Sequence, residues 1–455
     1  MLEGKKNIYF IGIGGCSMNG LAQILTKRGY SVSGSDRDQS PFTAHLQKLG
    51  VPVYIGHDAK QVEGADLIIY SAAIKPDHIE RAAARALGIP ELERSAALGE
   101  ISGQYEKVVG VAGCHGKTTI TSMLACITLA GVTDATVHVG GNVPFLSGGT
   151  RIGESDLFIT EACEYVESFL TLHPSVVTIS NIDDDHLDYY KDIGEIVEAF
   201  KKFLRLLPPD GLFIGCIDDQ HVRALMGAHT TEVRSISYGL DKDAAYRPAN
   251  IAYDANGFSS FDLQHHNKTL FRITLQIPGK HNVLNAVCAA VTALELGEDP
   301  AHIIDGLARY TLTQRRFEKC GVRDGVTIYH DYAHHPAEIR AALEGASRVP
   351  HGKLFCVFQC NSYTRAKTLF SKNVSCFLQA DTVLVPDIYP GREQDDGSIH
   401  ARDMVAGINA MQPNKAQYFA TFEEIREYLS ANAHEGDMVI TLGSGDVYKQ
   451  TGKLL

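Results

Sequence analysis

The sequence has no long apolar segment and no excess of positive charge, and both absences exclude classes of protein. The residues before the first strand pattern, Met1-Leu2-Glu3-Gly4-Lys5-Lys6, do not form the apolar stretch of a signal peptide or a membrane span. The formal net charge is -12, which argues against a general affinity for nucleic acid or anionic membranes. We therefore expect a cytoplasmic protein with no nucleic-acid or membrane partner.

Cysteine pairs at metal-binding spacing are also missing, and the closest pair, Cys356 and Cys360, is expected to pack in the interior. The 10 cysteines are scattered and form no Cys-x-x-Cys motif, a pattern typical of free thiols in a reducing compartment. The sequence contains no internal repeat or low-complexity tract. A hydrophobic content of 44% with 21% charged residues is ordinary for a globular protein. Because 455 residues exceed what one core usually supports, we expect two or three domains.

What the sequence does contain is a glycine-rich turn between a strand and a helix. Residues 108–112 are an apolar run and residues 119–130 carry apolar side chains at helical spacing, so Gly113-Cys114-His115-Gly116-Lys117-Thr118-Thr119 falls on the turn. Such a turn directs backbone N–H groups and the positive helix end at one point. We interpret it as a phosphate-binding loop, with Lys117 at the terminal phosphates and Thr118 near magnesium. Val111 replaces the first glycine of the full Walker pattern, so a purely structural turn is the alternative.

Acidic residues follow two further predicted strands. Glu161 comes after the strand 156–160, and Asn181-Ile182-Asp183-Asp184-Asp185-His186 follows the strand 175–180. Carboxylates at strand ends beside a phosphate loop suit a divalent cation, and this oxygen-rich set favours magnesium over zinc. For the second segment alone, a capped helix start with exposed aspartates is the alternative interpretation.

A second glycine turn lies near the N-terminus. The predicted strand 7–13 ends in Gly12-Ile13-Gly14-Gly15-Cys16-Ser17-Met18, and the next strand, 31–35, ends at Asp36. The turn approximates a dinucleotide-binding fingerprint, although Ser17 occupies the third glycine position. The spacing indicates a nucleotide diphosphate with Asp36 near its ribose. A tight packing turn with a solvated aspartate is the alternative.

Strand and helix patterns alternate in three blocks, which predicts an α/β protein of three domains. We expect a Rossmann-like N-terminal domain over 1–105, a central P-loop ATPase-type mononucleotide-binding sheet over 106–313, and a Rossmann-like C-terminal domain over 314–455. A period-two pattern over 246–277 predicts antiparallel strands inside the second block. Two nucleotide-like turns and polar strand ends suggest an ATP-driven ligation, in which phosphoryl transfer to a carboxylate creates the leaving group that an amine displaces.

The motifs occur in the order found in the Mur ligases, which the chain resembles over essentially its whole length. They are the phosphate loop, Glu161, residues 181–186, His281-Asn282-x-x-Asn285, Arg315-Arg316-Phe317-Glu318 and Asp331-Tyr332-Ala333-His334-His335-Pro336. The resemblance implies a cytoplasmic enzyme of peptidoglycan synthesis, and hence of cell wall biogenesis, cell shape and cell division. The chain is most similar to the branch that uses ATP, with Mg²⁺ or alternatively Mn²⁺, to join L-alanine to the lactyl carboxylate of UDP-N-acetylmuramate.

The resemblance also implies a role for each matching residue. ATP would contact residues 113–119 together with Asn282, Asn285, Arg315 and Asp331. The UDP moiety would contact Gly12, Gly14, Gly15, Cys16, Ser17, Met18 and Asp36. Metal ions would bind to Thr118, Glu161 and His186, and the amino acid would lie by Tyr332, His334 and Arg365. Catalysis would depend on Lys117, Glu161, His186, His334 and Arg365.

One segment departs from the family pattern Phe-Gln-Pro-His-x-Tyr-Thr-Arg. Here Cys360 and Asn361 replace the proline and histidine, and Ser362 replaces an arginine of some relatives. Asn361 can form hydrogen bonds but carries no positive charge. The alternatives are therefore a ligase that recycles a murein tripeptide, or one with another amine donor. Outside the class, a nucleotide-binding regulatory protein without turnover and a dinucleotide oxidoreductase are the rival interpretations.

Overall fold

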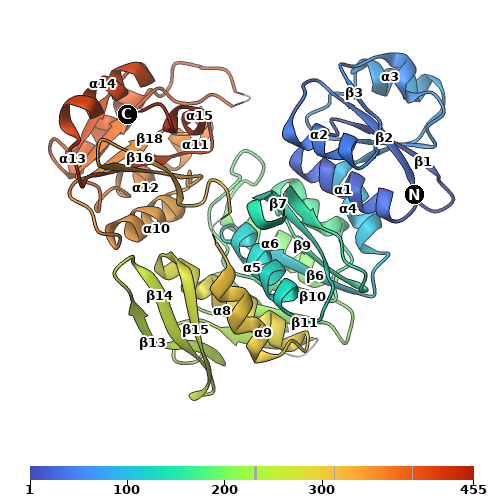
Figure 1. Cartoon of the computed structure of the whole chain (residues 1–455), viewed down its shortest axis with the longest axis horizontal. Helices are drawn as coiled ribbons and strands as arrows, with labels where there is room; N and C mark the ends of the chain where they lie inside the picture. The colour runs from blue at the N-terminus through green and yellow to red at the C-terminus, as the bar shows by residue number, and fades with distance from the viewer. Residues whose placement is uncertain (147, 230–232, 312, 392, 455) are drawn as a thin grey trace. The chain divides into compact units, whose positions relative to one another are not determined.

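The computed structural model describes residues 1–455 except 147, 230–232, 312, 392 and 455. The chain divides into two compact units. Unit 1 comprises Met1–Ile182, Gly194–Tyr246 and Val287–Gly306, and unit 2 comprises Asp183–Ile193, Arg247–Ala286 and Leu307–Leu455. Within the described residues, three β-sheets alternate with helices along the chain (Figure 1), which confirms the predicted α/β class. The predicted domain limits stay predictions.

The N-terminal sheet of unit 1 is parallel and has the strand order β3-β2-β1-β4-β5. Its central strand buries Tyr9, Phe10 and Ile11, as expected for a strand covered on both faces. The strand order reverses between β1 and β4, the point at which such sheets bind ligands. The elements are β1 (Asn7–Ile11), α1 (Cys16–Lys27), β2 (Ser31–Asp36), α2 (Pro41–Lys48), β3 (Val53–Ile55), η1 (Ala59–Val62), β4 (Leu67–Tyr70), α3 (Ile79–Ala86), β5 (Glu91–Glu93) and α4 (Arg94–Ser102).

The strands of the second sheet that lie in unit 1 have the order β12-β11-β10-β6-β9-β7-β8. Strand β6 pairs in parallel with β9 and β10, so the carboxyl ends of the three strands share one edge. The elements are β6 (Lys107–Ala112), α5 (Lys117–Ala130), β7 (Thr136–Val143), η2 (Pro144–Leu146), β8 (Gly148–Arg151), β9 (Leu157–Glu161), η3 (Tyr165–Thr171), β10 (Val176–Ile179), α6 (Ile193–Leu204), β11 (Leu212–Cys216), α7 (Gln220–His229), β12 (Arg234–Tyr238), α8 (Lys280–Glu295) and α9 (Pro300–Arg309). This edge carries the phosphate loop.

Unit 2 contains a sheet of order β16-β17-β21-β18-β19-β20 and an antiparallel pair, β14 with β15, which confirms the period-two prediction. Alternate residues of β18 belong to the cores on opposite sheet faces: Cys356 and Phe358 on one, Phe355 and Val357 on the other. The elements are β13 (Tyr246–Tyr253), β14 (Phe258–His265), β15 (Lys268–Pro278), β16 (Glu318–Arg323), β17 (Val326–Asp331), α10 (Pro336–Ser347), β18 (Leu354–Phe358), α11 (Tyr363–Thr368), α12 (Phe370–Val374), β19 (Thr382–Val385), α13 (Ala401–Met411), β20 (Ala416–Tyr418), α14 (Phe422–Asn432), β21 (Met438–Leu442) and α15 (Val447–Thr451). Among the described residues, no helix combines the length and apolar character needed to cross a bilayer.

Candidate active site

The phosphate loop connects β6 to α5 in unit 1, where the sequence pattern predicts a strand-to-helix turn. Gly113 has a φ of +127° and Gly116, the residue that precedes α5, has a φ of 90°. Both angles lie in the region that glycine adopts most readily. A Cβ atom on Gly113 would also lie 2.2 Å from Ser180 Oγ. The backbone at Gly113 therefore requires glycine for space as well as for conformation.

The residues that follow β10 hold this loop in shape. Asn181 Oδ1 accepts a hydrogen bond from His115 N at 2.8 Å, and Asn181 Nδ2 donates to His115 O at 2.9 Å. Ser180 Oγ donates to the same carbonyl at 2.7 Å, and Cys114 N donates to Asn181 O at 3.1 Å. The sequence placed Asn181 in an oxygen-rich metal cluster. In the structure its side-chain amide instead binds the loop backbone.

Lys117 lies in a buried ion pair. Its Nζ is 2.8 Å and 3.0 Å from the two carboxylate oxygens of Glu164, and it also donates to the carbonyl oxygens of Gly113 and Cys114. The Lys117 side chain is 14% exposed and that of Glu164 is 1% exposed. Burial alone would lower the pKa of Lys117, but the negative charge of Glu164 raises it above its ordinary value. Lys117 is therefore held in its charged form.

Thr118 and Glu161 offer oxygen atoms at the same sheet edge. Thr118 lies in the first turn of α5 and is partly exposed. Glu161 ends β9 in register with Val111, and its Oε1 accepts a hydrogen bond from Gly140 N at 2.9 Å. A hydroxyl and a carboxylate are the donor types that a hard divalent cation such as Mg²⁺ prefers. The chemistry of this pair therefore fits the predicted metal site.

The N-terminal glycine turn brings its predicted residues to the carboxyl ends of β1 and β2. Asp36 Oδ2 accepts a hydrogen bond from Gly14 N at 2.8 Å, and a Cβ atom on Gly14 would lie 2.8 Å from that oxygen. Helix α1 begins at Cys16, so Ser17 and Met18 belong to its first turn. Ser17 Oγ lies 2.9 Å from Nε2 of His138, a residue that the sequence did not single out. Met18 is 2% exposed and packs in the core.

In unit 2, Asp185 connects two of the predicted catalytic residues. Its Oδ1 lies 3.0 Å from Arg365 Nη2 and accepts a hydrogen bond from the backbone N–H of His186 at 2.8 Å. His186 has a φ of 54°. Burial would raise the pKa of Asp185, but the positive charges of His186 and Arg365 hold it well below its usual range. An ionised Asp185 thus fixes the position of the Arg365 guanidinium.

A second polar cluster of unit 2 lies on the turn between β17 and α10. Asp331 accepts hydrogen bonds from Phe317 N at 2.8 Å and Ala333 N at 2.7 Å, and burial raises its pKa to about 6. The guanidinium carbon of Arg315 lies 4.5 Å from the centre of the Tyr332 ring. This stacking places two predicted ligand-binding residues together.

His334 is on the same turn, and one of its ring nitrogens contacts two oxygen atoms. Its Nδ1 lies 3.0 Å from Tyr332 O and 3.4 Å from a carboxylate oxygen of Glu338. Burial lowers the pKa of His334, so the ring favours its neutral form. Glu338 was not identified from the sequence, where its only signal is its place one helical turn beyond His334.

The predicted adenine-contacting amides occur at the start of α8, also in unit 2. Asn282 Nδ2 donates to Pro278 O at 2.7 Å, and Asn285 Nδ2 donates to Asn282 Oδ1 at 3.2 Å. Both residues are buried. Neither bond satisfies a backbone N–H of the helix start, so these contacts order the first turns of α8 without capping the helix. The predicted adenine contact stays a prediction.

The segment that departs from the family pattern is built around α11. Cys360 is 2% exposed, and burial raises the pKa of its thiol to about 12. Asn361 Nδ2 donates to Ser444 Oγ. Ser362 has a φ of 66°, and its Oγ accepts a hydrogen bond from Arg365 N at 3.3 Å. Of these three residues, Ser362 therefore supports the helix that carries Arg365.

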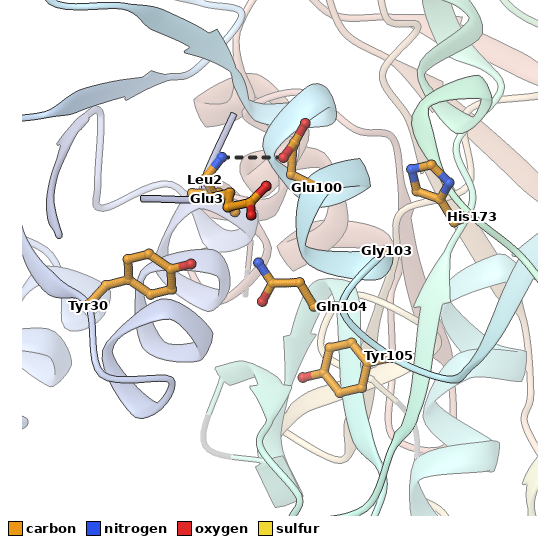
Figure 2. Close-up of a pocket in the computed structure, with 8 residues that line it drawn as sticks. All are labelled: Leu2, Glu3, Tyr30, Glu100, Gly103, Gln104, Tyr105 and His173. Atoms are coloured by element: carbon orange, nitrogen blue, oxygen red, sulfur yellow. Dashed lines mark hydrogen bonds between the residues drawn. The ribbon is translucent and has the colours of Figure 1, made fainter. Parts of the chain in front are cut away.

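A cavity of about 560 Å³ lies elsewhere in unit 1 (Figure 2). Figure 2 shows Glu100 on α4 bonded to the backbone N–H of Leu2, a hydrogen bond of 3.3 Å. None of the predicted site residues lines this cavity. Its lining residues are Leu2, Glu3, Tyr30, Glu100, Gly103, Gln104, Tyr105 and His173.

Three family descriptions match successive parts of the chain. They are the Mur ligase family catalytic domain at residues 7–106, the Mur ligase middle domain at 111–293 and the Mur ligase glutamate ligase domain at 315–445. The order and extent of these matches agree with the three sheets and with the lysine-bearing loop of the second sheet. The chain belongs to the Mur ligase family.

Two named relatives are similar to this chain over nearly its whole length. The chain is 44% identical over 445 residues to a protein of Acetivibrio thermocellus named UDP-N-acetylmuramate–L-alanine ligase, which covers 98% of this chain and 94% of that protein. A protein of the same name from Alkaliphilus metalliredigens is 43% identical over 443 residues, covering 97% of this chain and 95% of that protein.

Solved structures agree with this likeness. A UDP-N-acetylmuramate-alanine ligase of Thermotoga maritima has a TM-score of 0.80 at 25% identity and covers 98% of both chains. A murein peptide ligase of Psychrobacter arcticus has a TM-score of 0.72 at 22% identity, covering 99% of this chain and 98% of that chain, and shares the fold. The predicted three-domain α/β fold is confirmed.

Proposed function

We propose that this chain is an ATP-dependent ligase that joins L-alanine to the lactyl carboxylate of UDP-N-acetylmuramate during peptidoglycan precursor synthesis. The observation that carries the proposal is the 44% identity, over 98% of the chain, to a ligase of that name. We place the reaction in the cytoplasm and take Mg²⁺ as the divalent cation, with Mn²⁺ as its substitute. The substrates are small molecules, with no nucleic-acid or membrane partner.

The phosphate loop of unit 1 would bind ATP. Lys117 is charged and held at the mouth of the loop by Glu164, so phosphate oxygens can replace the carboxylate as its partner. Backbone N–H groups of the loop and the start of α5 would face the same phosphates. Thr118 and Glu161 would hold the divalent cation, which when bound offsets negative charge on the transferring phosphoryl group.

The proposed chemistry proceeds in two steps. A carboxylate oxygen of the nucleotide substrate attacks the γ-phosphorus, the bond to ADP breaks, and an acyl phosphate forms. The amine of L-alanine then attacks the acyl carbon and inorganic phosphate leaves. The Asp185-held Arg365 would bind the carboxylate of alanine, and His334, whose lowered pKa favours the neutral ring, would accept the proton of the amine.

A coupled assay of phosphate release tests this proposal. UDP-N-acetylmuramate and MgATP are held constant while single amino acids and the tripeptide L-alanyl-γ-D-glutamyl-meso-diaminopimelate are supplied in turn. We expect release with L-alanine, and none when the nucleotide substrate or the amine is omitted. Release with the tripeptide but not with alanine would replace the proposal with murein-peptide recycling.

The same panel of amines also tests whether the segment 358–365, which departs from the family pattern, accepts a different amine donor. Asn361 lies beside the helix of Arg365 and lacks the positive charge of the usual histidine. A different amine donor would therefore appear as release with another amino acid in preference to L-alanine. Absence of release with every amine, together with retained ATP binding, would instead favour a regulatory protein without turnover.

A further inference from the structure

Two histidines and a glutamate meet at the N-terminal sheet of unit 1, apart from the residues assigned to ATP, UDP or alanine. His57 follows β3, His78 directly precedes α3, and Glu80 lies in the first turn of α3. Nδ1 of His57 is 3.1 Å from Glu80 Oε2, and Nδ1 of His78 is 3.9 Å from the same oxygen. One ligand atom of each residue lies within 4.8 Å of the other two.

These separations suit a tetrahedral metal ion. Zinc binds imidazole nitrogen and carboxylate oxygen at about 2.0–2.2 Å, which places neighbouring donor atoms of a tetrahedron about 3.3 Å apart. The observed distances of 3.1 Å and 3.9 Å lie on either side of this value. The two imidazole rings meet edge to face, with centroids 4.5 Å apart and an interplanar angle of 84°. Small side-chain rotations are therefore sufficient to direct both Nδ1 atoms at one ion.

The carboxylate of the cluster is already oriented. Glu80 is 0% exposed. Tyr9 OH donates a hydrogen bond to its Oε1 at 2.9 Å, and Ser35 Oγ donates to its Oε2 at 2.7 Å. Hydrogen bonds of this kind fix the direction of a ligating carboxylate and tune its affinity for metal.

The histidines are suitably placed to complete a site. Nδ1 of His78 is buried and forms no hydrogen bond with any residue that the structure describes. The His57 and His78 side chains are 20% and 19% exposed, so an ion can reach the buried carboxylate from solvent.

We propose that His57, His78 and Glu80 bind one Zn²⁺ ion through the two Nδ1 atoms and a carboxylate oxygen, with water in the fourth position. Two imidazole ligands favour zinc over magnesium, which prefers oxygen. On binding, Nδ1 of His57, which faces Glu80 and Ser35, releases its proton to solvent, Nε2 takes up the ring proton, and Nδ1 turns to the metal. The ion links the segment after β3 to the start of α3, and Ser35 precedes Asp36 of the proposed UDP site.

Zinc stoichiometry tests the site directly. The full chain is freed of metal with a chelator and then titrated with Zn²⁺ in competition with a chromophoric chelator. Because zinc can also bind thiols and the catalytic metal site, the decisive quantity is the difference between the parent and its variants. We expect the parent to bind one more equivalent than His57→Asn and His78→Asn, with affinity at that site reduced at least about 10-fold in each variant.

His45→Asn is the matched control, because His45 is a partly exposed residue of α2 in the same domain and lies outside the cluster. It should bind as much zinc as the parent. Asparagine is a favourable N-cap residue, so His78→Asn preserves the start of α3. As a second readout, zinc should raise the thermal unfolding midpoint of the parent and of His45→Asn more than that of the other two variants. Equal stoichiometry and equal thermal shifts in all four proteins would overturn the proposal.

Discussion

The strand-to-helix turn after β6 in unit 1 and the one after β17 in unit 2 both bury a charged side chain, but they compensate its charge differently. Lys117 is paired with the carboxylate of Glu164 at 2.8 Å. Asp331 is held by two backbone N–H groups, at 2.7 Å and 2.8 Å. The first side chain has a formal opposite charge as its partner, and the second has peptide dipoles.

The consequence is that the two pKa shifts favour opposite charge states. The pKa of Lys117 is raised, so its charged form is stabilised in spite of burial. The pKa of Asp331 is also raised, to about 6, so burial makes its charged form less stable in spite of the hydrogen bonds. Full pairing thus keeps a buried charge available for a ligand, whereas partial compensation leaves the group near its titration point.

The largest effect is expected when the charge of Lys117, on the turn after β6, is removed. Lys117→Ala should lower the rate of ligation by about 10³-fold or more, because it removes the cation that we propose faces the transferring phosphoryl group. Coupled phosphate release measures this rate. Lys201→Ala is the control, since Lys201 pairs with Glu198 on the surface at 2.6 Å and should retain parental activity. Undiminished ligation by Lys117→Ala would show that the phosphate site is elsewhere.

Removing the partner of Lys117 should destabilise the free protein. Glu164→Gln leaves a buried ammonium without its counter-charge, which we expect to lower the free energy of unfolding by about 3 kcal/mol. Urea denaturation with and without MgATP measures the change. Because bound phosphates would supply the missing negative charge, the deficit should narrow with MgATP. A deficit that does not depend on MgATP would contradict the proposed exchange of partners.

The pH dependence of stability tests the raised pKa of Asp331, on the turn after β17. Its pKa rises from 3.8 to about 6 on folding, so it binds a proton more readily in the folded chain. Its favourable contribution is complete below pH 4 and is lost as the pH rises through 6. The free energy of unfolding of the parent minus that of Asp331→Asn should fall by about 3 kcal/mol between pH 4 and pH 7. A difference that is constant across this range would mean that Asp331 has an ordinary pKa.

A smaller effect is expected where the charge is kept and only its geometry changes. Arg365→Lys retains a cation beside Asp185 but loses the planar fork that can bind a carboxylate at two points. The KM for L-alanine should rise about tenfold, with little change in the KM for ATP. Lys372→Ala is the control. Lys372 is 44% exposed and pairs at 2.6 Å with Asp184, the residue next to Asp185. An equal rise in both KM values would argue against a role in amine binding.

The smallest effect concerns the cap of α11. Ser362→Ala removes the hydrogen bond to Arg365 N and should cost about 1 kcal/mol of stability, measured by thermal unfolding. Ser362→Gly should be closer to neutral, because glycine relieves the φ of 66° at this position. If the two variants were equally destabilised, the cap would not be the cause.

Much of the fold could be predicted from the sequence. The apolar runs at residues 354–358, 382–385 and 438–442 coincide with β18, β19 and β21, because each is a buried apolar run with clear ends. Boundaries at glycine turns were less accurate. The predicted strand 7–13 ends at Ile11, since Gly12 has a φ of 82°.

The residues of the candidate site were only partly predictable. Lys117 is recognisable because its motif is continuous in the chain. Its partner Glu164 is 47 residues away, and neither charge nor spacing distinguishes Glu164 from the other acids of the sequence. Asp185 belongs to the predicted acidic segment, but its contact with Arg365 spans 180 residues and has no signal in the sequence. Such contacts depend on strand order and on which side chains become buried.

The sequence by itself determined the alternation of strands and helices, the glycines of the two turns and the order of the family motifs, because these depend on neighbouring residues. The tertiary structure alone decided that Asn181 shapes the phosphate loop, that Glu164 keeps Lys117 charged, and that His57 and His78 meet at Glu80. The physical reason is burial: once water is removed, a polar group must find a partner, and the paired strands determine which partner is within reach.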